Sequence, residues 1–383
     1  MGLRITVSII VNLKRPGSQF LTGTGKTEEI IRTAKKLETE CIVFSDSLSP
    51  SQQRNWEAFS ELCVIDRQEV ILDIFAARAV TKEAALQVGL ARMEYSLPRL
   101  TRAWTHLSRQ RGGTRGTRGE GETQLETDRR IVLRKISRMK KELLTVKKTR
   151  ATQRKKRLRK PVITASIVGY TNAGKSSLLK ALTGADVFIE NKLFATLDPT
   201  VKRMELPSGR DLLLTDTVGF IRDLPHDLID AFKSTLEEAV YADFLIHVLD
   251  SSNPEINEHF RTTISVLKEL GVVKKEIITV FNKIDLAKES LLPPLLEENH
   301  SPAVSLSAET GEGLEDLVRI MDEIATRELG IADFHFPSDR HDLTAYLHRH
   351  GKVIKEKYEN NYIDVRAEIP DKIKHKLDKF VKK

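Results

Sequence analysis

The stretch that most constrains the fold is "VITASIVGYTNAGKSSLLKAL", residues 162–182. An apolar, β-branched run leads into G-x-x-x-x-G-K-S, and a helix-forming run follows it. In such a loop the first glycine permits a tight turn, backbone N–H groups surround the phosphates, the lysine reaches the outer phosphates and the hydroxyl binds Mg²⁺. The sequence therefore predicts a strand, a phosphate-binding loop at residues 169–176 and a helix, all within an α/β domain.

A second Gly-Lys-Thr occurs near the start of the chain, in "FLTGTGKTEE". The first glycine of the phosphate-loop pattern would fall at Phe20, and Pro16 interrupts any strand leading into the loop. We predict a glycine-rich turn that begins a helix at Thr27, and no nucleotide site there.

Three further motifs follow predicted strands in the order expected of a GTP site. Asp216 in "DTVG" can reach Mg²⁺ through water, and Gly219 lets its N–H approach the γ-phosphate. Asp285 in "NKID" can accept both guanine N1–H and N2–H, and adenine lacks these donors. "SLSAETGEG" places Ser307 in a loop suited to lie under the base. Together the motifs predict a GTP-hydrolysing domain.

Two roles around the γ-phosphate are less well defined by the residues. The Mg²⁺ shell needs a threonine, and "FATLDPT" offers both Thr196 and Thr200, which spacing does not separate. Phe220 stands where many GTPases have a glutamine that orients the attacking water, so hydrolysis is predicted to be slow without a partner. His226 is a candidate substitute, although "LPHDL" is equally typical of an exposed turn.

Charge and apolar spacing predict a basic helical hairpin over residues 81–160. Residues 129–160 contain 16 Lys and Arg and one acid, within a chain of 383 residues and net charge +8. A first helix carries a heptad seam and a second helix carries another, on either side of five glycines in residues 112–121. The seams are Ala84, Val88, Ala91 and Tyr95, then Val132, Ile136, Met139, Leu143 and Val146. So many like charges indicate a polyanionic partner, and we expect RNA rather than a merely solvated face.

The remaining segments complete an α/β multidomain protein with four parts. An N-terminal α/β unit (1–80) has predicted strands in "ITVSIIV", "CIVFSD" and "LCVID" and helices at 27–38 and 51–62. The hairpin (81–160) precedes the P-loop GTPase domain (161–330), a mostly parallel sheet with helices on both faces. A C-terminal α/β part (331–383) has a strand near "FHF", a helix near 343–348, a hairpin in "VIKEKYENNYIDVRAEI" and a basic final helix.

The cysteines, the histidines and the apolar segments indicate the compartment in which the chain works. Cys41 and Cys63 lie in short apolar runs and are expected to be buried, reduced thiols in adjacent strands. His341, His348 and His350 are interpreted as surface histidines rather than metal ligands. No stretch predicts a signal peptide or a membrane helix, so we expect a cytoplasmic monomer without stable membrane insertion.

Taken together, "GEGETQLETDRR", "VGYTNAGKSSLLKALTGADV", "KLFATLDPT" and "LLTDTVGFIRDLPH" resemble the HflX family of ribosome-associated GTPases. The resemblance covers nearly the whole chain. It implies binding of the large (50S) ribosomal subunit, stimulation of hydrolysis by it, and splitting of stalled or idle ribosomes. It also implies contact of the N-terminal part and hairpin with ribosomal RNA, with the glycine-rich tip entering the peptidyl-transferase region.

The resemblance also assigns site residues. Lys175, Thr196 and Gly219 carry the catalytic role, Ser176 and Thr196 hold Mg²⁺, and Asn172 in related GTPases helps to hold K⁺. The implied nucleotide-binding residues are Gly169, Tyr170, Thr171, Asn172, Ala173, Gly174, Lys175, Ser176, Phe194, Ala195, Thr196, Leu197, Asp198, Asp216, Thr217, Val218, Gly219, Asn282, Lys283, Ile284, Asp285, Ser305, Leu306 and Ser307.

Two departures from the family pattern concern efficiency on the ribosome. The family usually has several dozen more residues before the "ITVSIIV" segment, and the tip has Glu120-Gly121 where a proline is common.

Two alternative functions use the same residues: a GTPase of ribosome assembly, and an RNA-binding protein whose GTP site only gates its affinity.

Overall fold

The structure is a computed structural model that divides into two compact units. The first holds Met1–Leu144, and the second begins at Thr145. Each unit is described by itself below. The described residues are 4–13, 15–100, 118–157, 162–184, 194, 197–222, 238–272, 275–287, 302–359, 361–370 and 377–382.

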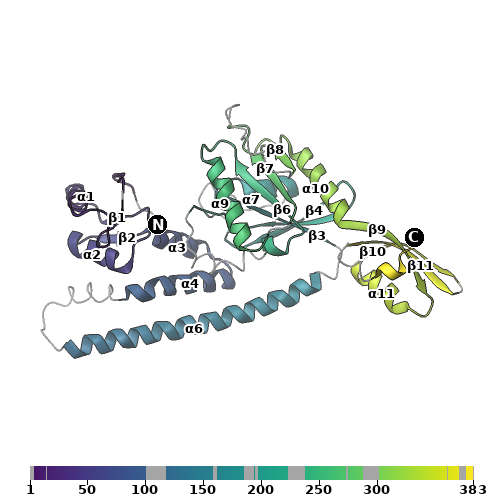
Figure 1. Ribbon diagram of the computed structural model, residues 1–383, viewed down its shortest axis with the longest axis horizontal. Helices are drawn as coiled ribbons and strands as arrows, with labels where there is room; N and C mark the ends of the chain where they lie inside the picture. Colours follow the sequence, from purple (N-terminus) through teal and green to yellow (C-terminus); the bar gives the residue numbers. More distant parts are fainter. Residues whose placement is uncertain are drawn as a thin grey trace. The chain divides into compact units, whose positions relative to one another are not determined.

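The N-terminal unit is built from short helices around a two-stranded parallel sheet (Figure 1). Its elements are α1 (Thr24–Lys36), β1 (Cys41–Val43), α2 (Pro50–Ser60), β2 (Cys63–Ile65), α3 (Arg67–Arg78), α4 (Lys82–Ser96), the 3-10 turn η1 (Leu97–Arg99) and α6 (Arg118–Arg157) as far as Leu144. The fully buried Trp56 of α2 packs with Phe20, Leu48 and Val64, and its indole N–H donates to the Phe20 carbonyl at 2.6 Å. Two of the three predicted strands, in "CIVFSD" and "LCVID", and both predicted helices in this part are confirmed.

The glycine-rich "GTGKT" segment begins a helix, as predicted. Gly23 is the N-cap of α1, and the buried Thr27 donates its hydroxyl to the Gly23 carbonyl at 3.1 Å. Lys26 forms an ion pair with Glu29 one turn later. Its side chain therefore lies on the helix surface, paired with Glu29.

The strand predicted in "ITVSIIV" was wrong. Residues 4–13 contain no strand, and Ile5 and Ile10 are more than four-fifths exposed. An extended segment becomes a strand only by pairing its backbone with a neighbour. Alternating apolar residues cannot supply that pairing on their own.

The expected burial of the two cysteines was also wrong, although they do lie in adjacent strands. Cys41 pairs with Cys63 across the β1–β2 ladder, so both side chains lie on one face of the small sheet. Ile42 and Val64 occupy the opposite face and pack against the Trp56 core. As a result Cys63 is exposed and Cys41 is half-buried.

A buried carboxylate joins the end of β2 to α4. Asp66 is fully buried and accepts the Leu48 N–H at 3.0 Å, the Glu69 N–H at 2.9 Å and the Tyr95 hydroxyl at 2.9 Å. The Arg99 guanidinium stacks over the Tyr95 ring at 3.7 Å and lies 3.7 Å from Asp66. Burial, followed by the Asp66 charge, raises the pKa of Tyr95, which therefore remains a hydrogen-bond donor.

The helical hairpin is present, but the apolar seam predicted for its first helix, α4, does not face α6. On α6 the predicted residues Val132, Ile136, Met139 and Leu143 do form the packed face. The residues that contact them are Leu86, Leu90 and Met93 of α4 and Leu97 of η1, which have the same 4, 3, 4 spacing shifted by two positions. The predicted α4 set of Ala84, Val88, Ala91 and Tyr95 is buried elsewhere, with Tyr95 directed to Asp66.

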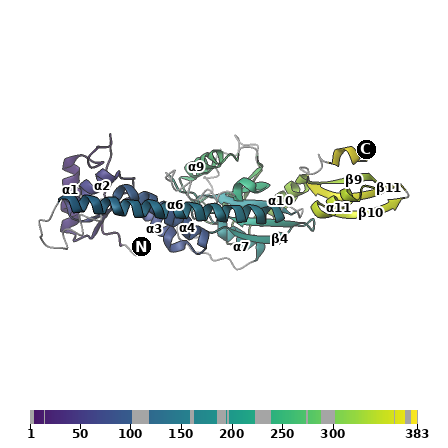
Figure 2. The ribbon, with the colours of Figure 1, turned by 90° about the horizontal axis from the view of Figure 1, so that it is seen from below.

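The GTPase domain in the second unit is a doubly covered sheet. Its described strands are β3 (Ile163–Gly169), β4 (Thr200–Glu205), β5 (Asp211–Asp216), β6 (Phe244–Asp250), β7 (Ile277–Asn282) and β8 (Ala303–Ser305), in the spatial order β4-β5-β3-β6-β7-β8. Every pair is parallel except β4 with β5. The helices α7 (Lys175–Thr183) and α10 (Leu314–Glu328) pack on one face and α9 (Ile256–Glu269) on the other (Figure 2). The parallel strands therefore end at one edge, where the motifs lie.

In the C-terminal segment the predicted strand and the predicted hairpin are present and form one three-stranded antiparallel sheet, with a helix against it. The order is β10 (Lys352–Glu359), β11 (Tyr362–Pro370) and β9 (Leu329–Pro337), and α11 (His341–His350) and the 3-10 turn η3 (Asp378–Phe380) pack on one face. A largely buried ion pair between Arg210, in the β4–β5 turn, and Glu368 of β11 attaches this sheet to the GTPase domain. Most of the predicted final basic helix lies outside the described residues.

Removal of the Asp66 carboxylate should destabilise the N-terminal unit. We expect Asp66→Ala to lower its free energy of unfolding by about 3–5 kcal/mol, because three buried donors and a nearby guanidinium lose their acceptor. Urea unfolding followed by Trp56 fluorescence, in a Trp104→Phe background, measures this. The exposed Asp46→Ala should change stability by no more than about 0.5 kcal/mol, and equal effects of the two substitutions would contradict the role given to Asp66.

Candidate nucleotide site

The phosphate loop has a backbone shape that requires its glycines. Gly169 ends β3 with φ +147°, and a Cβ there would lie 2.3 Å from the Val248 carbonyl oxygen. Gly174, the N-cap of α7, has φ +94°, and a Cβ there would lie 2.2 Å from the Asn282 side-chain nitrogen. Asn172 also adopts a left-handed conformation, with φ +61°. The loop thus curls tightly into the N-terminus of α7, which is the arrangement that binds phosphate.

Lys175 places a buried cation inside this loop. Its side chain is buried, and its Nζ donates to the Tyr170 carbonyl at 2.8 Å. Burial lowers the pKa of Lys175 to about 8, and the nearby Asp216 carboxylate opposes this effect. A phosphate at the loop would supply the negative charge that this ammonium group needs.

Two residues of the predicted Mg²⁺ site, Ser176 and Asp216, meet where β5 ends and α7 begins. The Ser176 hydroxyl donates to the buried Asp216 carboxylate at 2.6 Å. A hydroxyl and a carboxylate are hard oxygen ligands of the type that Mg²⁺ prefers, so this pair fits the ion. Of the adjacent predicted segment, Phe194 and Leu197 are buried, Asp198 is described, and Ala195 and Thr196 lie outside the described residues.

The segment from Asp216 to Arg222 runs against the phosphate loop. The Thr217 hydroxyl donates to the Ile167 carbonyl at 2.7 Å, and Phe220 exchanges backbone hydrogen bonds with the loop on both sides. Gly219 approaches so closely that a Cβ there would lie 2.9 Å from the Lys175 Nζ. The Phe220 side chain is buried, so its ring packs in the interior. The candidate water-orienting residue His226 lies outside the described residues.

The predicted guanine-binding motif is hydrogen-bonded to the phosphate loop. The buried Asn282 donates to the Ala173 carbonyl at 2.9 Å and accepts the Ala308 N–H at 3.0 Å. Lys283 donates to the Asn172 carbonyl at 2.8 Å. Ile284 is half-buried and the Asp285 side chain is exposed beside them. The Leu306 N–H bonds the Phe281 carbonyl, which brings residues 305–307 to the same edge.

Sequence reasoning missed Asp250 and the role of His259. Asp250 ends β6, forms a 2.6 Å ion pair with Lys283 and accepts from the Ser252 hydroxyl. Its position after the apolar run "FLIHVL" is a signal that could have been used. His259 of α9 stacks on the Tyr170 ring, which no local pattern indicates.

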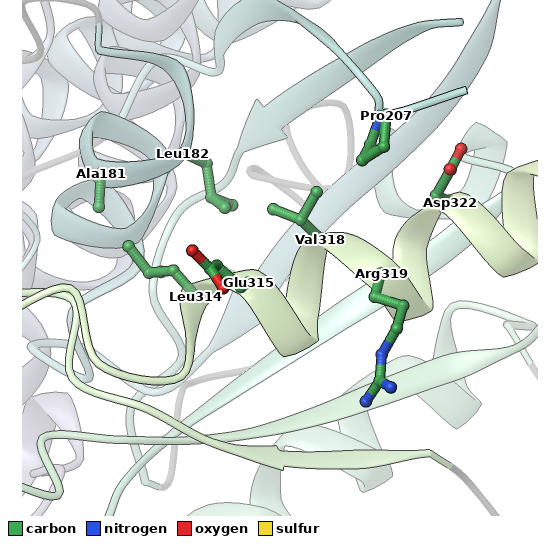
Figure 3. A pocket seen from close by; sticks show the side chains of 8 residues that line it. All are labelled: Ala181, Leu182, Pro207, Leu314, Glu315, Val318, Arg319 and Asp322. Carbon is green, nitrogen blue, oxygen red and sulfur yellow. The ribbon is translucent and has the colours of Figure 1, made fainter. Parts of the chain in front are cut away.

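A pocket on the domain does not belong to the nucleotide site. It lies between α7, the β4–β5 turn and α10, and Leu182, Leu314 and Val318 contribute apolar side chains to it (Figure 3). Pro207 and Asp322 lie at its border. It contains none of the motif residues, so it carries no nucleotide-binding role here.

The mostly parallel sheet carries a phosphate loop, the Ser176–Asp216 oxygen pair that suits Mg²⁺ and the predicted guanine motif, all at one edge. These features together define the P-loop GTPase class. Comparisons with known proteins agree with this class. Residues 164–283 match the family described as "50S ribosome-binding GTPase", residues 1–76 match "GTP-binding GTPase N-terminal" and residues 78–157 match "GTP-binding GTPase Middle Region".

Relatives of known name match most or all of the chain. The chain is 49% identical to "GTPase HflX" of Akkermansia muciniphila over 392 aligned residues, covering 100% of this chain and 90% of the relative. It is 41% identical to "GTPase HflX" of Escherichia coli, covering 97% and 88%. It is 50% identical to "GTPase HflX" of Treponema denticola, covering 83% of each. The chain belongs to the HflX family and hydrolyses GTP.

Nucleotide binding should be linked to a proton at Lys175. Because its pKa is lowered to about 8 in the ligand-free protein, the ammonium charge is lost as the pH rises above this value. A bound phosphate favours the charged form, so binding at pH 9 should take up close to one proton. Affinity for GDP should fall by up to about tenfold for each pH unit above 8.

Calorimetric titrations with GDP at pH 9, in two buffers of different ionisation enthalpy, measure this uptake. Lys180→Met, at an exposed position of the same helix, should keep the uptake unchanged. Equal heats in both buffers for the unsubstituted protein would show that Lys175 stays protonated without nucleotide.

Proposed function

We propose that the chain binds GTP and GDP at the edge of the sheet where the motifs meet. In this proposal Lys175 and the loop N–H groups hold the phosphates, the Gly219 N–H contacts the γ-phosphate and Asp285 recognises guanine. The buried ammonium group of Lys175, whose pKa is lowered by burial, is the observation that supports phosphate binding most directly. Asn282 and Lys283 support the same site by fixing the guanine motif to the loop.

Magnesium would be held by Ser176 and Thr196, with Asp216 behind them. When bound, the ion neutralises charge on the β- and γ-phosphates as the phosphoryl bond breaks. Asn172 is proposed to hold K⁺ beside the phosphates. Its side chain is exposed, so the amide oxygen is accessible to a cation.

Helix α6 is proposed to bind ribosomal RNA of the large (50S) subunit. Its apolar face, around Ile136 and Leu143, is occupied by packing against α4. Arg130, Arg134 and Lys135 lie exposed outside that face. Cations in this position can replace the counterions of RNA phosphates. The name "50S ribosome-binding GTPase" of the matched family supports the same partner.

Slow hydrolysis alone and faster hydrolysis on the large subunit follow from Phe220. Its ring is buried, and its backbone is paired with the phosphate loop. Among the residues that the structure describes, none is placed to orient the attacking water from this position. The ribosome is therefore proposed to complete the site.

Splitting of stalled or idle ribosomes is the proposed outcome, with the glycine-rich tip at residues 112–121 as the part that enters the subunit. The tip lies outside the described residues. A role in ribosome assembly and a GTP-gated RNA-binding role remain the alternatives, because they would use the same residues. In every case we propose a cytoplasmic monomer. No helix in the described part of the chain is long and apolar enough to cross a bilayer.

The test of this proposal is the rate of GTP turnover alone, with mature large subunits and with immature large subunits. Stimulation by mature subunits, together with dissociation of intact ribosomes, supports splitting. Stimulation only by immature subunits supports an assembly role. Turnover that neither particle changes would overturn the ribosomal function while leaving the GTPase intact.

Guanine selectivity should depend on Asp285. We expect Asp285→Asn to weaken GDP binding by about 10⁴-fold and to shift preference toward xanthine nucleotides, whose extra carbonyl accepts from an amide. Competition binding with GDP and xanthosine diphosphate measures the shift. The neighbouring exposed Leu286→Asn should keep guanine preference. Undiminished guanine binding by Asp285→Asn would mean that another group recognises the base.

Charge reversal on α6 should weaken ribosome binding and its salt dependence together. We expect Arg130→Glu, Arg134→Glu and Lys148→Glu, combined, to reduce the log–log salt slope by about 2–3, since each phosphate contact contributes about 0.7–0.9. Affinity for GDP should not change. The matched control reverses Lys180, Arg261 and Lys268, exposed on α7 and α9, for the same change in net charge. Equal loss in both triple variants would indicate only a general charge effect.

A further inference from the structure

Tyr170, the second residue of the phosphate loop, connects that loop to the segment that carries Gly219. Its hydroxyl accepts the Arg222 backbone N–H at 2.8 Å. Its carbonyl accepts the Lys175 ammonium at 2.8 Å. It also forms a parallel bridge with Phe220. One residue therefore contacts both the phosphate-binding lysine and the chain just beyond the γ-phosphate glycine.

Anchors lie on both sides of Gly219. Before it, the Thr217 hydroxyl is bonded to the Ile167 carbonyl. After it, the Phe220 N–H donates to the Gly169 carbonyl at 3.0 Å, and the Phe220 carbonyl accepts the Thr171 N–H at 2.8 Å. The Tyr170 hydroxyl is the anchor two residues further on. It differs from the backbone anchors because one substitution can remove it without changing the main chain.

Helix α9 holds Tyr170 in place. The His259 ring is stacked on the Tyr170 ring, with 3.6 Å between centroids and an interplanar angle of 10°. Burial lowers the pKa of His259, with Glu255, Asp250 and Glu258 opposing this. Glu258 also accepts from the Arg222 guanidinium at 3.0 Å. The same turn of α9 therefore fixes the Tyr170 ring and the side chain of the residue that its hydroxyl bonds.

We propose that Tyr170 is a positioning residue for GTP hydrolysis, which sets the location of the Gly219 N–H through its hydroxyl and is held in orientation by His259. Only GTP carries the γ-phosphate that this N–H would contact, whereas both GTP and GDP contact the loop around Lys175. Loss of the hydroxyl should therefore affect the GTP-bound state and the chemical step, and should leave GDP binding almost unchanged. This inference depends on the GTPase chemistry and not on the ribosomal partner.

The decisive variant is Tyr170→Phe in the full chain, which keeps the ring stacked on His259 and removes one oxygen. We expect the ratio of affinities for a non-hydrolysable GTP analogue and for GDP to fall by about fivefold, the effect of losing one net hydrogen bond. Single-turnover hydrolysis, without ribosomes, should slow by a similar factor or more. The GDP dissociation constant should stay within about twofold. Tyr362→Phe, at an exposed tyrosine of β11, is the matched control and should change none of these.

A second pair of variants separates positioning from general stability. His259→Phe keeps an aromatic partner for Tyr170 and should behave nearly as the unsubstituted protein does, whereas His259→Ala should reproduce the Tyr170→Phe pattern. Thermal unfolding of each variant shows whether the domain is folded. The proposal is overturned if Tyr170→Phe leaves both the affinity ratio and the rate unchanged. A parallel loss of GDP and analogue binding would also overturn it, because the hydroxyl would then support only the shape of the loop.

Discussion

The GTPase domain depends on the burial of one cation, the Lys175 ammonium group, in the loop that follows β3. An ammonium group out of water is costly unless neighbouring groups compensate it. In this chain Lys175 has the Tyr170 carbonyl within hydrogen-bonding distance and the Asp216 charge nearby. Burial nevertheless lowers the pKa of Lys175 well below its usual range. A polyphosphate bound at this loop, as proposed, would supply negative charge beside this ammonium group.

This enclosure explains why distant parts of the chain converge on the loop. The side chain of Asn282 fills the space that a Cβ at Gly174 would need, and it bonds the Ala173 carbonyl. Lys283 is held between Asp250 and the Asn172 carbonyl. The proposed guanine motif and the proposed phosphate loop are therefore joined directly by hydrogen bonds.

Elements with a strong local signal were predictable from the sequence. The strand before Gly169, the helix after Gly174 and the order of the guanine motifs depend on patterns within about ten residues, and they appear where predicted. The choice of neighbour was not predictable in the same way. On α4, two sets of residues share heptad spacing, and only the complete fold shows that Leu90 and Met93, rather than Val88 and Ala91, meet α6. Likewise the Tyr170–His259 stack joins residues 89 positions apart, which no periodicity encodes.

The pairing of Cys41 with Cys63 has a practical consequence. These are the only cysteines in the sequence, both lie in the N-terminal unit, and Cys63 is exposed. A thiol-directed fluorophore would therefore attach to that unit alone, on the face of the small sheet away from the Trp56 core. Neither the phosphate loop nor α6 contains a competing thiol. The unsubstituted chain can therefore be labelled in its N-terminal unit for fluorescence measurements without engineered cysteines. Nucleotide turnover can be recorded in the same labelled sample.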